Sequence, residues 1–242
     1  MQAPLEVVGL SKDYNKKEAV KDISFKVNKN EIIGILGPNG CGKTTTIGMI
    51  LGLLKPSRGV VLINGIEIET KRVDLLDCLN FISPYVELPK KLTVRQNLEV
   101  YGRLYDVQNL KNKINTLSEK LRLNEIIDKI TGELSSGQKN RVSLAKSIIN
   151  DPLVLLLDEP TASLDPETGD FVRSFLENYQ KEMKASILLA SHNMSEVERL
   201  CSSVLMMKNG SIIDQGSPNK LIEKHGRKNM EEVFLKLTRE KI

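Results

Sequence analysis

The chain contains the stretch Gly37-Pro38-Asn39-Gly40-Cys41-Gly42-Lys43-Thr44, which matches the pattern G-x-x-x-x-G-K-[ST] of a loop that binds phosphate groups. The apolar residues 32–36 before it predict a buried strand. The residues after it place apolar side chains at helical spacing, namely Ile47, Ile50, Leu51 and Leu54. A glycine-rich turn could match the pattern by accident, but the flanking strand and helix favour a phosphate-binding loop.

The residue types of this loop suit a nucleotide and its metal ion. Its glycines let the backbone curl with its N–H groups pointing inward, and a following helix adds partial positive charge. We expect Lys43 to reach the outer phosphates and Thr44 to offer its hydroxyl oxygen to Mg²⁺. The predicted nucleotide-binding residues of the loop are Gly37, Pro38, Asn39, Gly40, Cys41, Gly42, Lys43, Thr44 and Thr45.

The composition is that of a soluble globular protein with one large domain or two small ones. Of its 242 residues, 40% are hydrophobic and 27% are charged, which allows a sizeable core. Apolar runs stay well below the roughly 18 residues that would span a membrane. The first six residues lack the pattern of a signal peptide, so we expect a cytosolic chain.

Cysteine usage and charge exclude several other classes. Cys41, Cys78 and Cys201 form neither a metal-ligand spacing nor a disulfide framework, which agrees with a reducing compartment. Nearby helix amides could lower the pKa of the Cys41 thiol, but a small side chain at a variable loop position is the favoured interpretation. The net charge of +4, without a dense basic cluster, does not indicate a nucleic-acid partner.

The pattern along the chain predicts an antiparallel β part followed by a helical lobe. Short strands surround segment 9–21 and the turn Asn64-Gly65, and they cover residues 5–8, 23–27, 60–63 and 66–68. From about residue 79 to residue 150 the pattern predicts helices, one of them capped by Thr93 with Gln96 three residues later. We expect one domain over residues 1–242, with a short helical tail at about 217–242.

A wholly apolar run further on, at residues 153–157, predicts a parallel strand covered on both faces, and residues 186–190 predict another buried strand. In such sheets, ligands collect at the carboxyl ends of the strands. Asp158 and Glu159 follow the first run, and His192 follows the second. Asp158 is thus the predicted partner of Mg²⁺, and Glu159 can orient an attacking water or accept its proton. A helix cap without a catalytic role would explain an isolated Asp-Glu pair, but a phosphate loop upstream favours the site.

The stretch Leu134-Ser135-Ser136-Gly137-Gln138 completes the pattern. Ser135 and Gln138 form a capping box, so a helix begins there and exposes N–H groups to an anion. The order of motifs resembles that of the nucleotide-binding domains of ATP-binding cassette (ABC) transporters, whose signature is Leu-Ser-Gly-Gly-Gln. The resemblance covers nearly the whole chain. It implies an α/β fold, with a P-loop NTPase core, an antiparallel β subdomain and an inserted helical subdomain.

In that family two domains face each other head to tail, and each signature closes over the ATP bound by its partner. The resemblance implies that Ser135, Gly137 and Gln138 contact ATP across a homodimer, or across a heterodimer with a similar ATPase. It also implies that Asp165 belongs to the loop after the Asp158-Glu159 pair, that Tyr14 stacks on adenine, and that His192 holds the γ-phosphate. The predicted catalytic residues are Glu159, His192 and Lys43, and the predicted metal-binding residues are Thr44 and Asp158.

One segment departs from the family pattern. Residues 81–87 contain no glutamine where the family has one that contacts Mg²⁺ and senses the membrane subunit. Pro84 or a neighbour occupies that place, so we assign no metal ligand there and expect water to complete the metal shell.

The sequence therefore predicts an ATP-hydrolysing subunit of an ABC transporter. We expect it to work through separate transmembrane permease subunits at the cytoplasmic face of the cell membrane, with ATP and Mg²⁺. The segment that begins at Leu92-Thr93-Val94 is similar to those of ABC-2 type exporters, and little chain follows Leu237, which together favour export. The alternative is a soluble ABC ATPase that acts as an ATP-dependent clamp. Such proteins usually carry two cassettes or long insertions, which this chain lacks.

Overall fold

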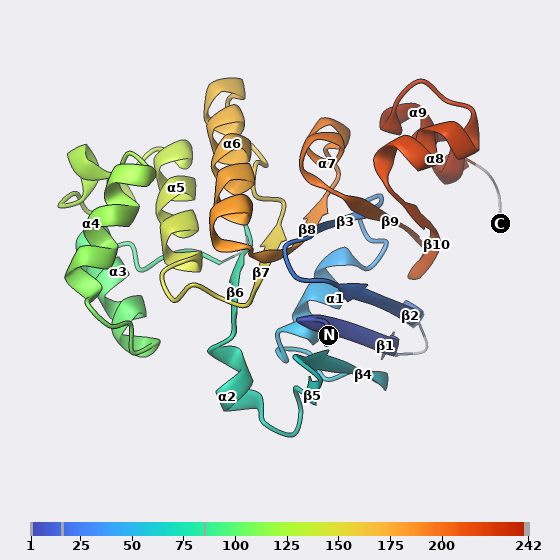
Figure 1. The fold of residues 1–242 in the computed structure, drawn as a ribbon, viewed down its shortest axis with the longest axis horizontal. Coiled ribbons are helices and arrows are strands. Elements are labelled where there is room, and N and C mark those ends of the chain that lie inside the picture. Colours follow the sequence, from blue (N-terminus) through green and yellow to red (C-terminus); the bar gives the residue numbers. More distant parts are fainter. Residues whose placement is uncertain (1, 16, 85, 240–242) are drawn as a thin grey trace.

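The computed structural model describes residues 2–15, 17–84 and 86–239, so Tyr85 of the departing segment and the last three residues of the predicted tail lie outside it. Its larger sheet has six strands in the order β10-β9-β3-β8-β7-β6 (Figure 1). These strands are β3 (Ile32–Leu36), β6 (Leu79–Ile82), β7 (Val154–Asp158), β8 (Ser186–Ser191), β9 (Ser203–Lys208) and β10 (Ser211–Gly216).

Parallel pairing brings the functional strand ends to one edge of this sheet. Strand β3 lies between β8 and β9 and pairs in parallel with both. In register, Leu36 lies opposite Ser191, and Asp158 lies opposite Ala190. The phosphate loop, the Asp-Glu pair and the histidine therefore leave the sheet side by side.

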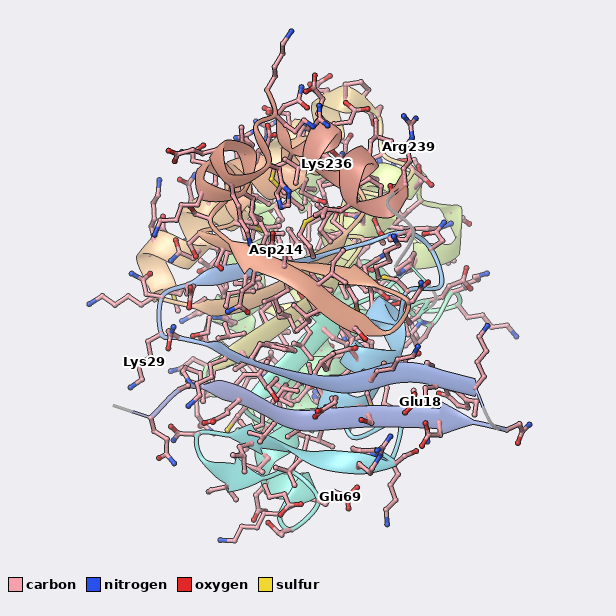
Figure 2. All side chains as sticks on the ribbon, turned by 90° about the vertical axis from the view of Figure 1, so that its right-hand side faces the viewer. Glu18, Lys29, Glu69, Asp214, Lys236 and Arg239 are labelled. Carbon is pink, nitrogen blue, oxygen red and sulfur yellow. The ribbon has the colours of Figure 1, made fainter. Side chains whose placement is uncertain are left out.

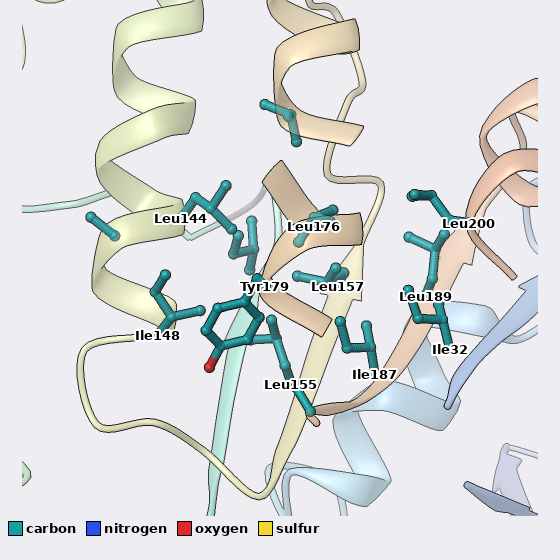
Figure 3. Packing of buried hydrophobic residues seen from close by; sticks show 14 of the residues in the cluster. Ile32, Leu144, Ile148, Leu155, Leu157, Leu176, Tyr179, Ile187, Leu189 and Leu200 are labelled. Carbon is teal, nitrogen blue, oxygen red and sulfur yellow. The ribbon is translucent and has the colours of Figure 1, made fainter. Parts of the chain in front are cut away.

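The parallel strands are buried on both faces, as their apolar runs predict. On β8, Ile187 and Leu189 pack into the cluster that includes α5 and α6, while Leu188 and Ala190 pack into the cluster that includes α1 and the second sheet. Figure 3 shows Leu189 among residues of β7 and α6. The helices that cover the sheet or extend from it are α1 (Lys43–Ile50), α2 (Arg72–Leu76), α5 (Ser136–Ser147), α6 (Pro166–Met183), α7 (Met194–Leu200), α8 (Pro218–His225) and α9 (Met230–Arg239).

The second sheet is antiparallel and has the order β2-β1-β4-β5. Its strands are β1 (Leu5–Tyr14), β2 (Lys17–Val27), β4 (Arg58–Ile63) and β5 (Ile66–Glu67). The hairpin at Asn64-Gly65 is confirmed. The prediction that segment 9–21 lies outside the strands is wrong, because β1 and β2 continue through most of it. Register shifts interrupt their pairing, and such bulges break the alternation by which strands are recognised in a sequence.

The helices α3 (Val94–Leu104) and α4 (Leu110–Lys120) lie beside α5 at one end of the molecule (Figure 1). Thr93 and Gln96 form the predicted capping box of α3. The predicted start of the helical part at residue 79 is wrong, because β6 occupies residues 79–82 and pairs in parallel with β7. Four residues are too few for their pattern to distinguish a strand from a helix.

Helix α8 packs against β10 and α9 packs against α8, at the end of the molecule opposite α3 and α4 (Figure 1); this end faces the viewer in Figure 2. The buried carboxylate of Asp214 on β10 contacts Lys224 Nζ at 2.6 Å and His225 Nε2 at 2.7 Å. Within the part of the chain that the structure describes, we find no helix that combines the length and the apolar character needed to cross a bilayer.

Lys146 joins α5 to β6, and it is only 7% exposed. Its Nζ donates to Asn80 Oδ1 at 3.1 Å and to Phe81 O at 3.2 Å, and it lies 4.6 Å from the centre of the Phe81 ring. These partners are neutral, so burial lowers the pKa of Lys146 to about 8.

This pKa predicts a pH dependence of the free energy of unfolding. Between pH 8 and pH 10 the folded state loses the Lys146 proton while the unfolded state retains it, so rising pH stabilises the fold. Relative to Lys146→Met, which cannot titrate, we expect the wild type to gain about 2 kcal/mol over this range. Urea unfolding of both proteins at several pH values measures the difference. Parallel stability curves would contradict the assignment.

Candidate functional site

The phosphate loop connects β3 to α1, and its shape depends on glycine. Gly42 precedes the helix with φ 113°, a left-handed conformation that residues with a Cβ rarely adopt. A Cβ there would also lie 2.7 Å from Ala19 O. Inside the loop, the nearly buried Lys43 donates from Nζ to Gly37 O at 2.7 Å and to Pro38 O at 3.4 Å. The ammonium group thus lies within the curve of the loop.

Asp158 is the last residue of β7, and its side chain lies against the start of α1. Thr44 Oγ1 donates to Asp158 Oδ2 at 3.2 Å, which brings the two predicted metal ligands together. Ser83, which follows β6, also forms a side-chain hydrogen bond with Asp158. Burial raises the pKa of Asp158 and the charge of Glu159 acts in the same direction, whereas these hydrogen bonds and the Lys43 charge oppose the rise.

Glu159 is held in a strained conformation at the sheet edge. Its φ is 51°, and its N–H donates to Ala190 O on β8 at 2.8 Å. Non-glycine residues with such positive φ cost free energy and cluster at functional sites. The side chain turns toward the histidine, and Glu159 Oε2 lies 2.7 Å from His192 Nδ1 and 3.4 Å from the His192 backbone nitrogen. The glutamate is mostly shielded while the imidazole is exposed.

These residues line one cavity of about 520 Å³, a volume in the range of small-molecule sites. Of the predicted site residues, it brings together Asn39, Gly40, Gly42, Lys43, Thr44, Thr45, Asp158, Glu159 and His192. Four further residues line it that were not among the predicted site residues, namely Ala19, Pro84, Ala162 and Ser163. The predicted phosphate loop, the Thr44–Asp158 contact and the Glu159–His192 pair thus share one cavity.

Comparison with known proteins agrees with this geometry. Residues 20–162 match the family model described as "ABC transporter". The chain is 34% identical over 221 residues to the "ABC transporter ATP-binding protein NatA" of Bacillus subtilis (strain 168), covering 90% of this chain and 89% of the relative. The chain belongs to the ABC transporter family. This membership confirms the predicted fold class and the identification of the chain as an ATP-binding ATPase subunit.

Two further similarities extend over most of the chain. It is 38% identical over 222 residues to the "Nod factor export ATP-binding protein I" of Rhizobium johnstonii (strain DSM 114642 / LMG 32736 / 3841), covering 90% of this chain and 71% of that one. A solved "ATP binding subunit of ABC transporter" superposes with a TM-score of 0.89 at 28% identity, covering 97% and 99% of the two chains. The structure of cbiO1 from Clostridium perfringens gives 0.81 at 31% identity, covering 99% and 97%.

Several predicted ATP-binding residues of this ABC subunit lie outside the cavity. Ser135 and Gln138 form the predicted capping box of α5, Gly137 lies against Thr168 of α6, and Asp165 caps α6. None of these residues is among those that line the cavity within the described chain. One protomer therefore presents the phosphate loop and the signature as separate surfaces.

Four further residues with a predicted role in nucleotide binding, three in the loop and one on β1, are not among those that line the cavity. Gly37 and Pro38 accept hydrogen bonds from Lys43 through their carbonyl oxygens. Cys41 is buried, and burial raises the pKa of its thiol, which contradicts a lowered value and agrees with a small packing side chain. Tyr14 lies at the end of β1, where it is 44% exposed and does not line the cavity. Its ring centre lies 5.2 Å from Lys12 Nζ.

Sequence reasoning missed the polar residues that support the site from behind. Ser83 was missed because the strand before it was assigned to the helical part. Glu196 accepts hydrogen bonds from Thr161 and Ser191, which lie close to Glu159 and His192 in the chain. The positions of Thr161 and Ser191 near two strand ends could have indicated a role at the site. Their shared contact could not be seen in the sequence, because Thr161 and Glu196 lie 35 positions apart in the chain.

The position of Lys43 inside the loop predicts that Lys43→Ala weakens ATP binding. Loss of the ammonium group removes a charge-assisted contact with phosphate, so we expect the dissociation constant to rise at least about tenfold. Isothermal titration calorimetry measures it, and a thermal melt verifies folding. Lys29→Ala, which removes an exposed lysine far from the loop, serves as the matched control (Figure 2). Equal affinity of both variants would contradict the assignment of the site.

Proposed function

We propose that this chain hydrolyses ATP at the cavity described above and drives transport through separate membrane subunits. The observation that carries the proposal is that one cavity holds Lys43, the Thr44–Asp158 contact and the Glu159–His192 pair. This set supplies phosphate binding, metal binding and proton transfer within reach of one nucleotide.

In the proposed reaction, water attacks the γ-phosphorus of ATP in line with the leaving ADP. The backbone N–H groups of the loop and Lys43 bind the phosphates and stabilise the charge that develops on them. Glu159 orients the water and accepts its proton. It releases that proton to solvent when the products ADP and phosphate leave. His192, hydrogen-bonded to Glu159, contacts the γ-phosphate. The hydrogen bond from its N–H to Ala190 O and the contact with His192 hold Glu159 in place before the substrate arrives.

The oxygen donors at the loop fit Mg²⁺. Mg²⁺ is usually held by one or two carboxylates, substrate phosphates and waters, and Thr44 Oγ1 and Asp158 Oδ2 supply two oxygens at the loop. No group of three or more His, Cys, Asp or Glu side chains suited to a metal occurs among the described residues, so a cage built wholly of such side chains does not compete. When bound, the ion neutralises phosphate charge. Ser83, through its bond to Asp158, orients that carboxylate where the family has a glutamine nearby.

We propose further that two copies, or this chain and a similar ATPase, form the complete site head to tail. The separation of the signature from the cavity within one protomer supports this arrangement. The Ser135 cap leaves helix N–H groups of α5 toward solvent, where the ATP of a partner can bind them.

The contact with membrane subunits is proposed for residues 82–84 and 86–90 and the helices beside them. A second cavity of about 240 Å³ lies between this segment and α5, and it shares Pro84, Glu159 and Ala162 with the first. Movement of a partner bound there would therefore reach the catalytic glutamate. We propose accordingly that the chain is a peripheral subunit at the cytoplasmic face of the membrane. The similarity to the Nod factor export proteins supports export as the direction.

The role of Glu159 predicts that Glu159→Gln binds ATP but hydrolyses it slowly. A neutral amide cannot accept the proton of water, so we expect turnover to fall by about 10²-fold or more while ATP affinity stays close to that of the wild type. A phosphate-release assay and calorimetry measure the two quantities. Glu223→Gln, an exposed change of the same chemistry on α8, is the control. Turnover near the wild-type rate would remove Glu159 as the proton acceptor.

The composite site predicts complementation between two inactive variants. Lys43→Ala disables the loop of a protomer and Ser135→Arg disables its signature, so each homodimer lacks an intact site. A heterodimer of the two retains one intact site. At equal mixing we expect ATPase activity to recover to about a quarter of the wild-type value.

The control for this mixture replaces Ser135→Arg with Thr116→Arg on the exposed side of α4, which leaves both signatures intact. A mixture of Lys43→Ala and Ser135→Arg that stays as inactive as its components would contradict the trans arrangement.

A further inference from the structure

Glu196 is a buried carboxylic acid that the proposed reaction does not use. It lies on α7, the helix that follows the histidine loop, and its exposed fraction is 0%. Burying an ionisable group costs free energy that an apolar side chain of similar size would avoid. The carboxylate must therefore provide something that packing alone does not.

What it provides is two hydrogen-bond acceptors at fixed positions. Thr161 Oγ1 donates to Glu196 Oε1 at 3.0 Å, and Ser191 Oγ donates to Glu196 Oε2 at 2.6 Å. The Asn193 side chain accepts from the backbone N–H of Glu196, which fixes the start of the helix. Both oxygens of the carboxylate are thus engaged, one by a hydroxyl from the turn after β7 and one by a hydroxyl at the end of β8.

The two hydroxyls lie next to the proposed catalytic pair in the chain. Thr161 lies two residues after Glu159, in a turn closed by the bond from Ala162 N to Glu159 O at 3.1 Å. Ser191 immediately precedes His192 and is itself buried. The carboxylate therefore links the segments around Glu159 and His192 through Thr161 and Ser191. The Glu159–His192 contact at 2.7 Å links the same segments directly.

The charges around Glu196 agree with this function. Burial raises the pKa of Glu196, and the nearby charge of Glu159 raises it as well. The two hydroxyl bonds and the charge of Arg173 on α6 act against that rise. The hydroxyls thus compensate the buried carboxylate, and in return the carboxylate restrains the loops on which they lie.

We propose that Glu196 is a positioning residue that holds the loops of Glu159 and His192 in their mutual geometry by accepting hydrogen bonds from Thr161 and Ser191. This inference rests on the proposed role of Glu159. Because a displacement of about 1 Å in a reacting group can cost up to two orders of magnitude in rate, loss of either hydroxyl lowers turnover. ATP binding, which depends on the phosphate loop, is unaffected.

The test measures steady-state ATPase activity of the full chain with Thr161→Val and Ser191→Ala, each of which removes one donor. We expect kcat to fall roughly tenfold in each variant while KM changes by less than about twofold. Thr161→Ser restores the hydroxyl and should return kcat to within about twofold of the wild type. Thr116→Val, which makes the same change as Thr161→Val at an exposed position of α4, should leave both constants unchanged.

A double-mutant cycle then tests whether the hydroxyls act through Glu196. In the Glu196→Ala background, adding Thr161→Val should lower kcat by less than about twofold, because the shared contact is already lost. Additive effects would overturn the inference. If Glu196→Ala does not fold in a thermal melt, the hydroxyl variants and the Thr161→Ser rescue decide the question alone.

Three other results would overturn the positioning role. They are kcat near the wild-type value in both hydroxyl variants, a rise in KM with kcat unchanged, and failure of Thr161→Ser to restore turnover. Glu159→Gln separates this inference from the proposed function. If Glu159→Gln loses turnover while the hydroxyl variants keep it, only the role of Glu196 fails. If Glu159→Gln also turns over normally, the proposed function fails.

Discussion

Parallel pairing of β3, β8 and β7 is the constraint on which the rest of the structure depends. Because parallel strands run in the same direction, their carboxyl ends meet at one edge, and each delivers a different chemical group there. The phosphate loop lies more than a hundred residues before Asp158, Glu159 and His192 in the chain, yet these groups share one cavity. Burial of the strands on both faces fixes their register. A shift of one residue would turn each side chain to the opposite face.

The position of Glu159 at the edge of the sheet also explains why neighbouring residues must restrain it. The chain must turn sharply after β7, and Glu159 adopts a left-handed conformation to do so. Such a conformation persists only where the surroundings enforce it. The N–H bond to Ala190, the turn to Ala162 and the contact with His192 supply that restraint. A reactive carboxylate is thereby directed into the cavity without a substrate to hold it.

Much of this arrangement could be predicted from local patterns. The loop, both capping boxes and the apolar strands were recognisable, because each depends on neighbouring residues and on side-chain periodicity. Strand β6 was not, since four residues carry too little pattern, and the bulges of β1 and β2 hid half of each strand. The contacts of Ser83 and Glu196 could not be predicted, because they depend on how separate strands and helices pack.

The sequence by itself determined the family and the order of most elements, and it predicts the phosphate, metal and proton-transfer groups, because these depend on residue types at fixed spacing. Only the tertiary structure decided which of those groups share a cavity and which face away. It placed Thr44 against Asp158 and Glu159 against His192, and it separated Ser135 from both. Distances between groups far apart in the chain depend on strand order and packing, which no local spacing specifies.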